Sequence, residues 1–399
     1  MIQLGCFDSG VQDSDCQAYL KTVEQLTRLA IKDVNAGPDR LQFMRYTPEA
    51  NAMTVAEVQQ GLKTAGFFTA GEVDGICGYR TQSALRLFQE YVRTYEKQVS
   101  VIPDGKFGPE SQAHLRRWLT GKLKSEWTPV MEAWQAGSMG DGEYAHWISW
   151  LAKVKQRYLA QPSPAIAKVS AAPNTFGSYK VADWDFSQKL GAHLIGIRRE
   201  EASNMSDDVF VLLLKGLVFK FQGSTEPGDT KDPRGYPFLM LGQHDYHFGW
   251  HQRSYLALKP QTKVLVARWK DRQWNDAALA NSLEGNDTIN IHWGGRGLLG
   301  QLNTWSEGCQ VITGSVYMNP RQQLIDCRSF MAIRSDDPIT NPNKTRGAYN
   351  VLVDLVTALS SEQSATVKYT LLAEGDLDLD AELKASIADA RSKVLAVGN

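Results

Sequence analysis

The chain has 399 residues and a formal net charge of −1, from 43 basic and 44 acidic side chains. This balance argues against a nucleic-acid-binding protein, which usually carries a basic excess, and the length predicts two or three folding units. Charged residues at 22%, with 15 prolines and 33 glycines, exclude a disordered or collagen-like chain.

The N-terminus shows no pattern of a classical signal peptide, because no Lys or Arg precedes Lys21 and no apolar segment follows. No uninterrupted apolar window of about 18 residues occurs, so no membrane insertion is expected. The cysteines have no regular spacing and no CxxC pair, so neither a disulfide framework nor a metal or other cofactor is indicated. They are Cys6, Cys16, Cys77, Cys309 and Cys327.

Residues 1–50 are predicted to be a helical N-terminal segment, and a better-defined helix follows them. Thr54 and Glu57 have the spacing of a capping box, in which each side chain satisfies the other's backbone N–H. Apolar residues then follow at helical spacing, and Gly66 is typical of a helix C-terminus.

An internal repeat with an offset of 30 residues follows this helix. The segment 74–78 (DGICG) recurs as 104–108 (DGKFG), and the match continues through the pairs Arg86/Arg116 and Phe88/Trp118. Each copy predicts a tight Asp-Gly turn that leads into a capped helix. On this pattern alone, the repeat indicates a small helical bundle with two similar turns.

The stretch VQQGLKTAGFF–EVDGICGYRTQSALRLFQEY resembles the three-helix, DGxxG-type peptidoglycan-binding domain family. The resemblance implies a domain over residues 51–120 that binds cell-wall peptidoglycan. Cys77 stands where the family usually has an aromatic residue. The residues of the DGxxG turn that we assign to peptidoglycan binding are Asp74, Gly75, Gly78 and Thr81.

The remaining chain changes from helical to β patterns. A helical connector is expected over 121–160, a Pro/Ala-rich linker over 161–175, a mainly β domain over 176–375 and a C-terminal helix over 376–399. The fold class is therefore multidomain, α plus mainly β. Predicted strands include 209–214, 217–221, 264–268, 288–292 and 367–372.

Cys309 and His292 are the candidate catalytic pair of the β-rich domain. Cysteine is a strong nucleophile when a base or cation stabilises its thiolate. Gly308 permits a strained turn before Cys309, with backbone N–H groups free for an oxyanion. Strand alternation places Asn290 and His292 on one face, away from the neighbouring isoleucines. The competing interpretation is a buried structural cysteine and a satisfied histidine.

The segment INIHWGG…WSEGCQVI resembles the catalytic core of the YkuD-type L,D-transpeptidases. The resemblance implies that Cys309 is the nucleophile, that His292 is the base, and that Ser306 and Gly308 shape the turn. Glu307 stands where the family has a second histidine, which predicts either a raised Cys309 pKa or an oriented His292. Gln310 and Val311 also depart from the family pattern. The predicted substrate-binding residues are His244, Tyr246, Trp250, Asn290, Trp305 and Glu307.

A histidine-rich segment over 243–251 offers an alternative. His247 and His251 have the i, i+4 spacing of a zinc site on a helix, but Gly242 and Gly249 disfavour a helix, and alternation places both histidines on one strand face. No HExxH glutamate is present. A zinc-dependent wall amidase or peptidase therefore remains an alternative to the cysteine enzyme.

Both resemblances point to peptidoglycan as the partner. We expect a cysteine enzyme that acts on stem peptides through an acyl-enzyme at the bacterial cell wall, after delivery by phage lysis or a secretion system. Hydrolysis (L,D-carboxypeptidase or endopeptidase) is favoured over L,D-transpeptidation, because the tail after Cys309 is altered. A non-catalytic cell-wall-binding protein is the further alternative. The sequence leaves the oligomeric state open.

Overall fold

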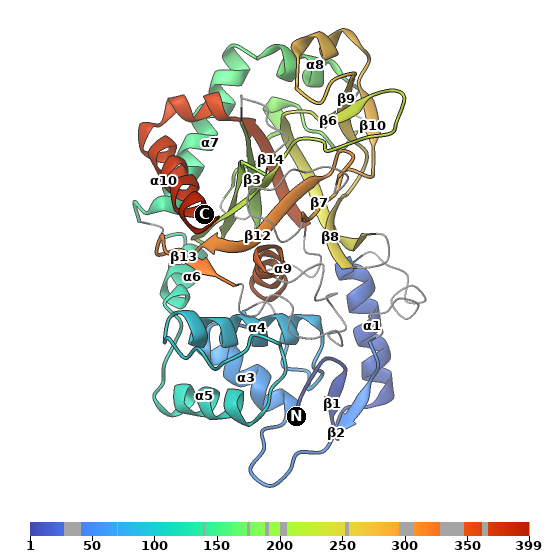
Figure 1. Ribbon diagram of the computed structural model, residues 1–399. Coiled ribbons are helices and arrows are strands. Elements are labelled where there is room, and N and C mark those ends of the chain that lie inside the picture. Colours follow the sequence, from blue (N-terminus) through green and yellow to red (C-terminus); the bar gives the residue numbers. More distant parts are fainter. Residues whose placement is uncertain are drawn as a thin grey trace.

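The structure is a computed structural model of the whole chain. It describes residues 1–27, 41–69, 71–138, 140–173, 176–187, 191–199, 206–251, 255–294, 306–327, 347–360 and 366–398. A helical N-terminal part lies below a β-rich C-terminal part in Figure 1, so the predicted multidomain class, α plus mainly β, is confirmed.

Three helices form the small domain predicted over 51–120. They are α3 (Val55–Ala65), α4 (Tyr79–Thr94) and α5 (Pro109–Thr120). The predicted capping box is present, since Glu57 N donates to Thr54 Oγ1 and Thr54 N donates to Glu57 Oε2. Gly66 ends α3 with φ of 91°, a conformation that favours glycine. Local sequence therefore sets both ends of this helix.

The N-terminal segment is part of the same domain and is only partly helical. Strand β1 (Cys6–Asp8) pairs in parallel with β2 (Met44–Tyr46), and α1 (Asp13–Thr27) lies between them in sequence. The Asp8 carboxylate accepts hydrogen bonds from the N–H groups of Val55 (2.8 Å) and Ala56 (2.9 Å). Asp8 thus stabilises the N-terminus of α3, where backbone donors lack helical partners.

The connector contains α6 (Trp127–Gln135) and α7 (Glu143–Ala160), as expected. The predicted linker over 161–175 is wrong in its central part, because α8 (Pro164–Ala171) forms there. Ser163 caps this helix by accepting from Ile166 N, and proline suits a first helical turn. Ala165, Ile166 and Val169 are buried, so packing converts a linker-like composition into a fixed helix.

The β-rich part is built around a nine-stranded sheet of the described residues, in the order β11-β8-β7-β14-β3-β4-β5-β12-β13. A further parallel pairing of β11 with β12 closes this sheet into a barrel. The strands are β3 (His193–Arg198), β4 (Asp208–Leu214), β5 (Leu217–Ser224), β7 (Gly242–His251), β8 (Tyr255–Pro260), β11 (Ile291–Trp293), β12 (Gln310–Met318), β13 (Leu324–Asp326) and β14 (Thr366–Ala373).

A second sheet lies at the upper end of the barrel in Figure 1 and consists of β10 (Glu284–Asn286), β9 (Val264–Trp269) and β6 (Tyr236–Leu239). Short 3-10 helices η1 (Val181–Asp183), η2 (Asp276–Ala280) and η5 (Glu374–Leu379) connect the elements. Among the helices of the described residues, none has the length and apolar character that a bilayer span requires.

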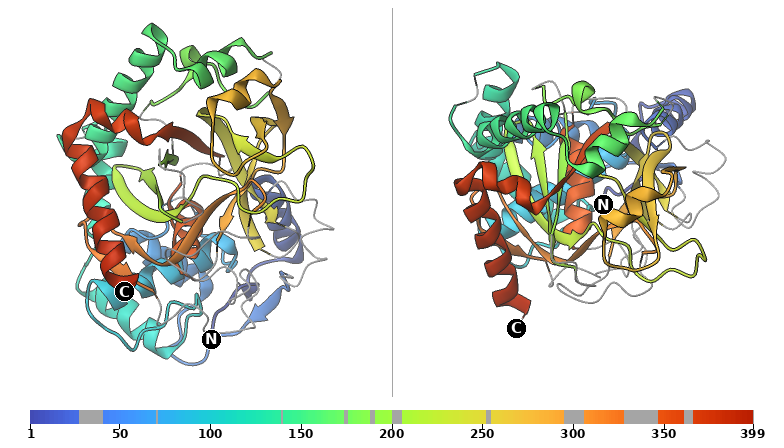
Figure 2. Two further views of the ribbon diagram at one scale, coloured as in Figure 1. Left: turned by 45° about the horizontal axis from the view of Figure 1, so that its top comes forward. Right: turned by 90° about the horizontal axis from the view of Figure 1, so that it is seen from above.

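The two faces of the barrel wall pack against different partners. The inner face joins the large core that also contains α9 (Ala348–Leu359), which is buried along its length. The outer face of β3 and β4 packs against α7 and α10 (Ala381–Gly398), which lie on the same side of the barrel in Figure 2. Strand alternation explains this division between inner and outer residues.

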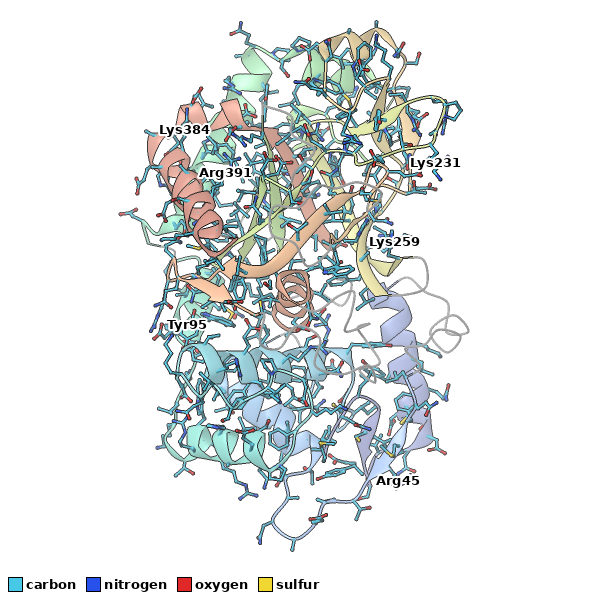
Figure 3. All side chains as sticks on the ribbon, in the orientation of Figure 1. Arg45, Tyr95, Lys231, Lys259, Lys384 and Arg391 are labelled. Carbon is cyan, nitrogen blue, oxygen red and sulfur yellow. The ribbon has the colours of Figure 1, made fainter. Side chains whose placement is uncertain are left out.

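Helices α4 and α9 join the helical domain to the barrel. Arg86 donates to both carboxylate oxygens of Asp354 over 2.9–3.1 Å, and the two side chains are 2% and 4% exposed. Tyr95, labelled in Figure 3, lies at this junction, with the Arg321 guanidinium 4.9 Å from the centre of its ring. The helical domain and the barrel therefore share a buried, charge-paired interface.

Candidate functional site

Cys309 lies beside Asn290 at the start of two parallel strands. Gln310 N donates to Asn290 O over 2.8 Å, and the register continues with His292 opposite Val311. Ile289 and Ile291 belong to the large core. Alternation then places Asn290, His292 and Cys309 on the opposite face of the barrel wall.

Backbone groups of the preceding loop hold the Cys309 thiol. Asn290 N donates to Sγ over 3.3 Å, and Sγ donates to Thr288 O over 3.2 Å. Tyr246 fixes the same loop from the barrel interior, because its hydroxyl donates to Ile289 O over 2.9 Å. Two backbone groups of this loop therefore fix the position of the thiol.

The turn before Cys309 depends on Ser306 and Gly308. Ser306 Oγ donates to Cys309 O over 2.6 Å and accepts from Gly308 N over 3.3 Å. A Cβ at position 308 would lie 2.5 Å from Pro237 Cγ, so close packing explains this glycine. The prediction of a strained turn is wrong, since Gly308 is not among the described residues with positive φ, and its N–H already has an acceptor.

The Cys309 thiol is protonated at neutral pH. Burial raises the pKa of Cys309 to about 11, and the adjacent Glu307 carboxylate acts in the same direction. Of the two effects expected from Glu307, the structure thus shows the raised thiol pKa. A cysteine protease-type ion pair would instead need a positive group beside the sulfur.

His292 is buried and neutral. Burial and the neighbouring His251 lower the pKa of His292 to about 3. Its Nδ1 lies 2.7 Å from Trp293 O, so Nδ1 carries the proton and Nε2 has a lone pair. No hydrogen bond joins this ring to the Cys309 sulfur in the described part of the chain, so the resting geometry does not contain a formed Cys–His pair.

His251 is the site residue that the sequence did not single out for the cysteine mechanism. Its ring stacks on His292 with a centroid distance of 4.3 Å, and its Nδ1 lies 3.0 Å from Asn290 Nδ2. The predicted alternation along 247–251 is confirmed by β7, which carries His251 to this face. The signal in the sequence was its even spacing of four residues from His247, which places both histidines on one face of a strand. Asn290, His251, His292 and Cys309 form one cluster, which we call the Cys309 cluster.

The predicted substrate rim is wrong for His244 and Tyr246, which are both fully buried. His244 contacts Ser178 Oγ (3.0 Å) and Met240 O (3.2 Å), and burial lowers its pKa to about 4. Both side chains are on the opposite strand face from His251, because β7 alternates. The Trp250 side chain and Trp305 lie outside the described residues.

The zinc alternative gains no support from the described residues, among which no three His, Cys, Asp or Glu side chains form a metal-binding group. His251 contacts His292 and Asn290 instead.

The Asp-Gly turn at 74–78 is stabilised by Gln59 of α3. Gln59 Nε2 donates to Asp74 Oδ1, Ile76 O and Thr81 Oγ1 over 2.8–3.0 Å, while its Oε1 accepts from Gly75 N over 2.9 Å. Gly75 has φ of 73°, which explains that glycine. Asp74, Gly75 and Thr81 thus have structural contacts, while Gly78 begins α4 as its N-cap.

The second copy of the repeat contains the same arrangement. Gln89 Nε2 donates to Asp104 Oδ1, Lys106 O and Ser111 Oγ, and its Oε1 accepts from Gly105 N. The offset of 30 between Gln59 and Gln89 is a sequence signal that the repeat analysis missed. The repeat therefore encodes one hydrogen-bonded turn used twice.

The thiol environment leads to a testable pH dependence. Alkylation of Cys309 by iodoacetamide is expected to be slow at neutral pH and to rise about tenfold per pH unit until the pH approaches the thiol pKa of about 11. Glu307→Gln removes a negative charge, lowers the thiol pKa and speeds alkylation at a fixed pH. Peptide mapping by mass spectrometry measures this rate.

The matched control is Asp378→Asn, which removes an exposed carboxylate that pairs with Lys384. It should leave the pH profile of Cys309 unchanged. A midpoint near neutral pH in the wild type would contradict the protonated resting thiol.

Comparison with known proteins finds similarity for one segment of the chain. No curated protein and no solved structure shows a significant match to the chain. Residues 52–94, which span α3, the first Asp-Gly turn and α4, match the family model described as a peptidoglycan binding domain. This similarity of residues 52–94 to a peptidoglycan binding domain supports association of the protein with the cell wall.

Proposed function

We propose that this protein is a peptidoglycan-processing cysteine enzyme that binds the wall through residues 52–94 and acts on stem peptides with Cys309. The match of residues 52–94 supports peptidoglycan as the substrate. The Cys309 cluster supports a reaction in which a cysteine is the nucleophile. The likeness of residues 176–375 to YkuD-type enzymes rests on the INIHWGG and WSEGCQVI motifs.

The proposed reaction begins with a rotation of the Cys309 side chain away from Thr288 O. His292 Nε2 accepts the thiol proton, and the thiolate attacks the carbonyl carbon of a stem-peptide bond. The C–N bond breaks, the leaving amine takes the proton from His292, and a thioester remains. Water then hydrolyses the thioester, which releases the carboxylic acid and restores the thiol. We favour this hydrolytic outcome over transfer to a second amine.

In this scheme the bound substrate must favour proton transfer from Cys309 to His292. With the thiol pKa near 11 and the His292 pKa near 3, proton transfer in the resting site is strongly unfavourable. A bound peptide that stabilises the imidazolium or the developing oxyanion would reverse this preference. The enzyme would therefore be activated by its own substrate.

A non-catalytic wall-binding protein is the second candidate, favoured by the protonated thiol and the neutral histidine. The test is mass spectrometry of muropeptides from purified sacculi after treatment with wild type and with Cys309→Ala. New stem-peptide products with the wild type alone are expected. Cys16→Ala, which alters a buried cysteine of the N-terminal segment, is the matched control and should retain activity.

The same samples separate the candidates when sedimentation with sacculi is also measured. Identical products from wild type and Cys309→Ala would exclude the cysteine mechanism. Binding of both proteins without any new product would establish the non-catalytic alternative.

A further inference from the structure

A cavity of about 430 Å³ is lined in part by α8, which lies at the end of the barrel opposite the helical domain in Figure 1. Its wall is contributed by α8, η2 and the ends of β3, β6 and β14. Leu239, Met240, Leu241 and Trp274 make much of this wall apolar. The volume is in the range of pockets that hold small molecules.

Arg198 supplies a positive charge to this cavity. The residue is 7% exposed, and its Nε and Nη2 donate to Thr225 Oγ1, Thr225 O and Leu239 O. These bonds fix the plane of the guanidinium. Nη1 has no acceptor among the described residues, so this donor is left for an occupant of the cavity.

Glu226 places a buried carboxyl group in the same cavity. The residue is 5% exposed, and within the described chain its carboxylate has neither a hydrogen-bond donor nor an ion-pair partner within 4.0 Å. Buried carboxylates are normally paired, because removing a charge from water is costly. Burial and the nearby Asp208 raise the pKa of Glu226 to about 8, although the Arg198 charge acts in the opposite direction. An ammonium group bound beside this carboxyl would lower its pKa and ionise it.

Arg198 and Glu226 therefore line one cavity without forming an ion pair with each other. The other charged lining residues, Arg199 and Asp276, contact Asp207 and Trp274 respectively. An α-amino acid group matches this arrangement, because it has a carboxylate for a guanidinium and an ammonium for a carboxylate. The apolar wall suits an aliphatic side chain. Simple anions or cations would leave one of the two charges unsatisfied.

We propose that this cavity binds the zwitterionic α-amino acid group of a small ligand, with its carboxylate on Arg198 and its ammonium on Glu226. The ligand is either a free amino acid or the free α-amino acid end of a larger molecule. Binding itself does not depend on the proposed reaction at Cys309.

The cavity is nevertheless linked to the Cys309 cluster. Ser224 pairs with Val311, and Gly228 N donates to Ser306 O over 2.6 Å, so the segment that carries Glu226 runs beside the turn before Cys309. An occupant that contacts Glu226 is thus positioned to influence that turn.

Isothermal titration calorimetry on the full chain tests this proposal. The probes are L-leucine, D-leucine, isocaproate (no ammonium) and isoamylamine (no carboxylate). At least one leucine enantiomer should bind, and both truncated analogues should bind at least about tenfold more weakly, since each lacks one charge-assisted contact. Equal affinity for leucine and either analogue, or no binding by any probe, would overturn the proposal.

Variants locate the binding in this cavity. Glu226→Gln should weaken leucine binding about tenfold or more. It removes no hydrogen bond that the described chain makes, so folding should be retained, as thermal unfolding checks. Asp378→Asn, at an exposed carboxylate, is the matched control. Unchanged leucine affinity in Glu226→Gln would overturn the assignment.

Two further probes distinguish a free amino acid from a larger ligand, and one variant separates this binding site from the proposed reaction at Cys309. Nε-acetyl-L-lysine and Nε-acetyl-D-lysine carry a free α-amino acid end on a longer chain. Their binding supports recognition of a larger molecule, whereas binding of leucine alone supports a free amino acid. Cys309→Ala should bind the same probes as the wild type, so failure of this site and failure of the cysteine mechanism are separately observable.

Discussion

Arg86→Leu is expected to lower the free energy of unfolding by about 3–5 kcal/mol, because it leaves the Asp354 carboxylate buried without its partner. Arg86 makes three hydrogen bonds to that carboxylate across the α4–α9 interface. The ion pair itself need not add much stability, but breaking one side of it is costly. Urea denaturation followed by tryptophan fluorescence measures the change.

The repeat provides a matched control for this substitution. Arg116 is the equivalent residue of the second copy, yet it is exposed, so Arg116→Leu should change the free energy of unfolding by less than about 1 kcal/mol. The double variant Arg86→Leu/Asp354→Leu should recover much of the lost stability, because no charge remains buried. Equal losses from Arg86→Leu and Arg116→Leu would refute the role of the ion pair.

Gln59→Leu is expected to cost about 2–4 kcal/mol of unfolding free energy. The substitution removes the partner of the Gly75 N–H and a donor to Asp74, and each unsatisfied buried group costs about 1–3 kcal/mol. Urea denaturation gives the stability, and sedimentation with sacculi reports whether the turn is needed for wall binding. Gln89→Leu should have a similar effect on stability, since its contacts are the same.

Gln60→Leu is the control, because Gln60 is the exposed neighbour of Gln59 on the same helix. It should leave stability within about 0.5 kcal/mol of wild type. A loss below about 1 kcal/mol in Gln59→Leu would show that the turn does not depend on this side chain.

Local signals in the sequence were sufficient for the helical domain. The capping box of Thr54 and Glu57, the left-handed Gly66 and the repeated Asp-Gly turns act between residues close in the chain. Such interactions are readable from spacing alone. The resemblance to peptidoglycan-binding domains rested on these same residues, and the family match confirmed it over residues 52–94.

The positions of the candidate site residues could be predicted only in part from the sequence. Alternation along 289–292 correctly separated Asn290 and His292 from the isoleucines that join the core. The same alternation along β7, applied to His244 and Tyr246, would have shown that they face away from His251. Their fully buried positions follow from closure of the barrel, which no local pattern encodes.

The sequence by itself determined the helical domain, its similarity to peptidoglycan-binding domains and the residue types of the Cys309 cluster. Capping, turns and strand alternation involve near neighbours, so they can be recognised from the sequence. Only the tertiary structure decided that α8 replaces a linker, that His251 stacks on His292, and that Arg198 and Glu226 share a cavity. These contacts join residues far apart in the chain. Their protonation and packing depend on burial, which the folded barrel alone creates.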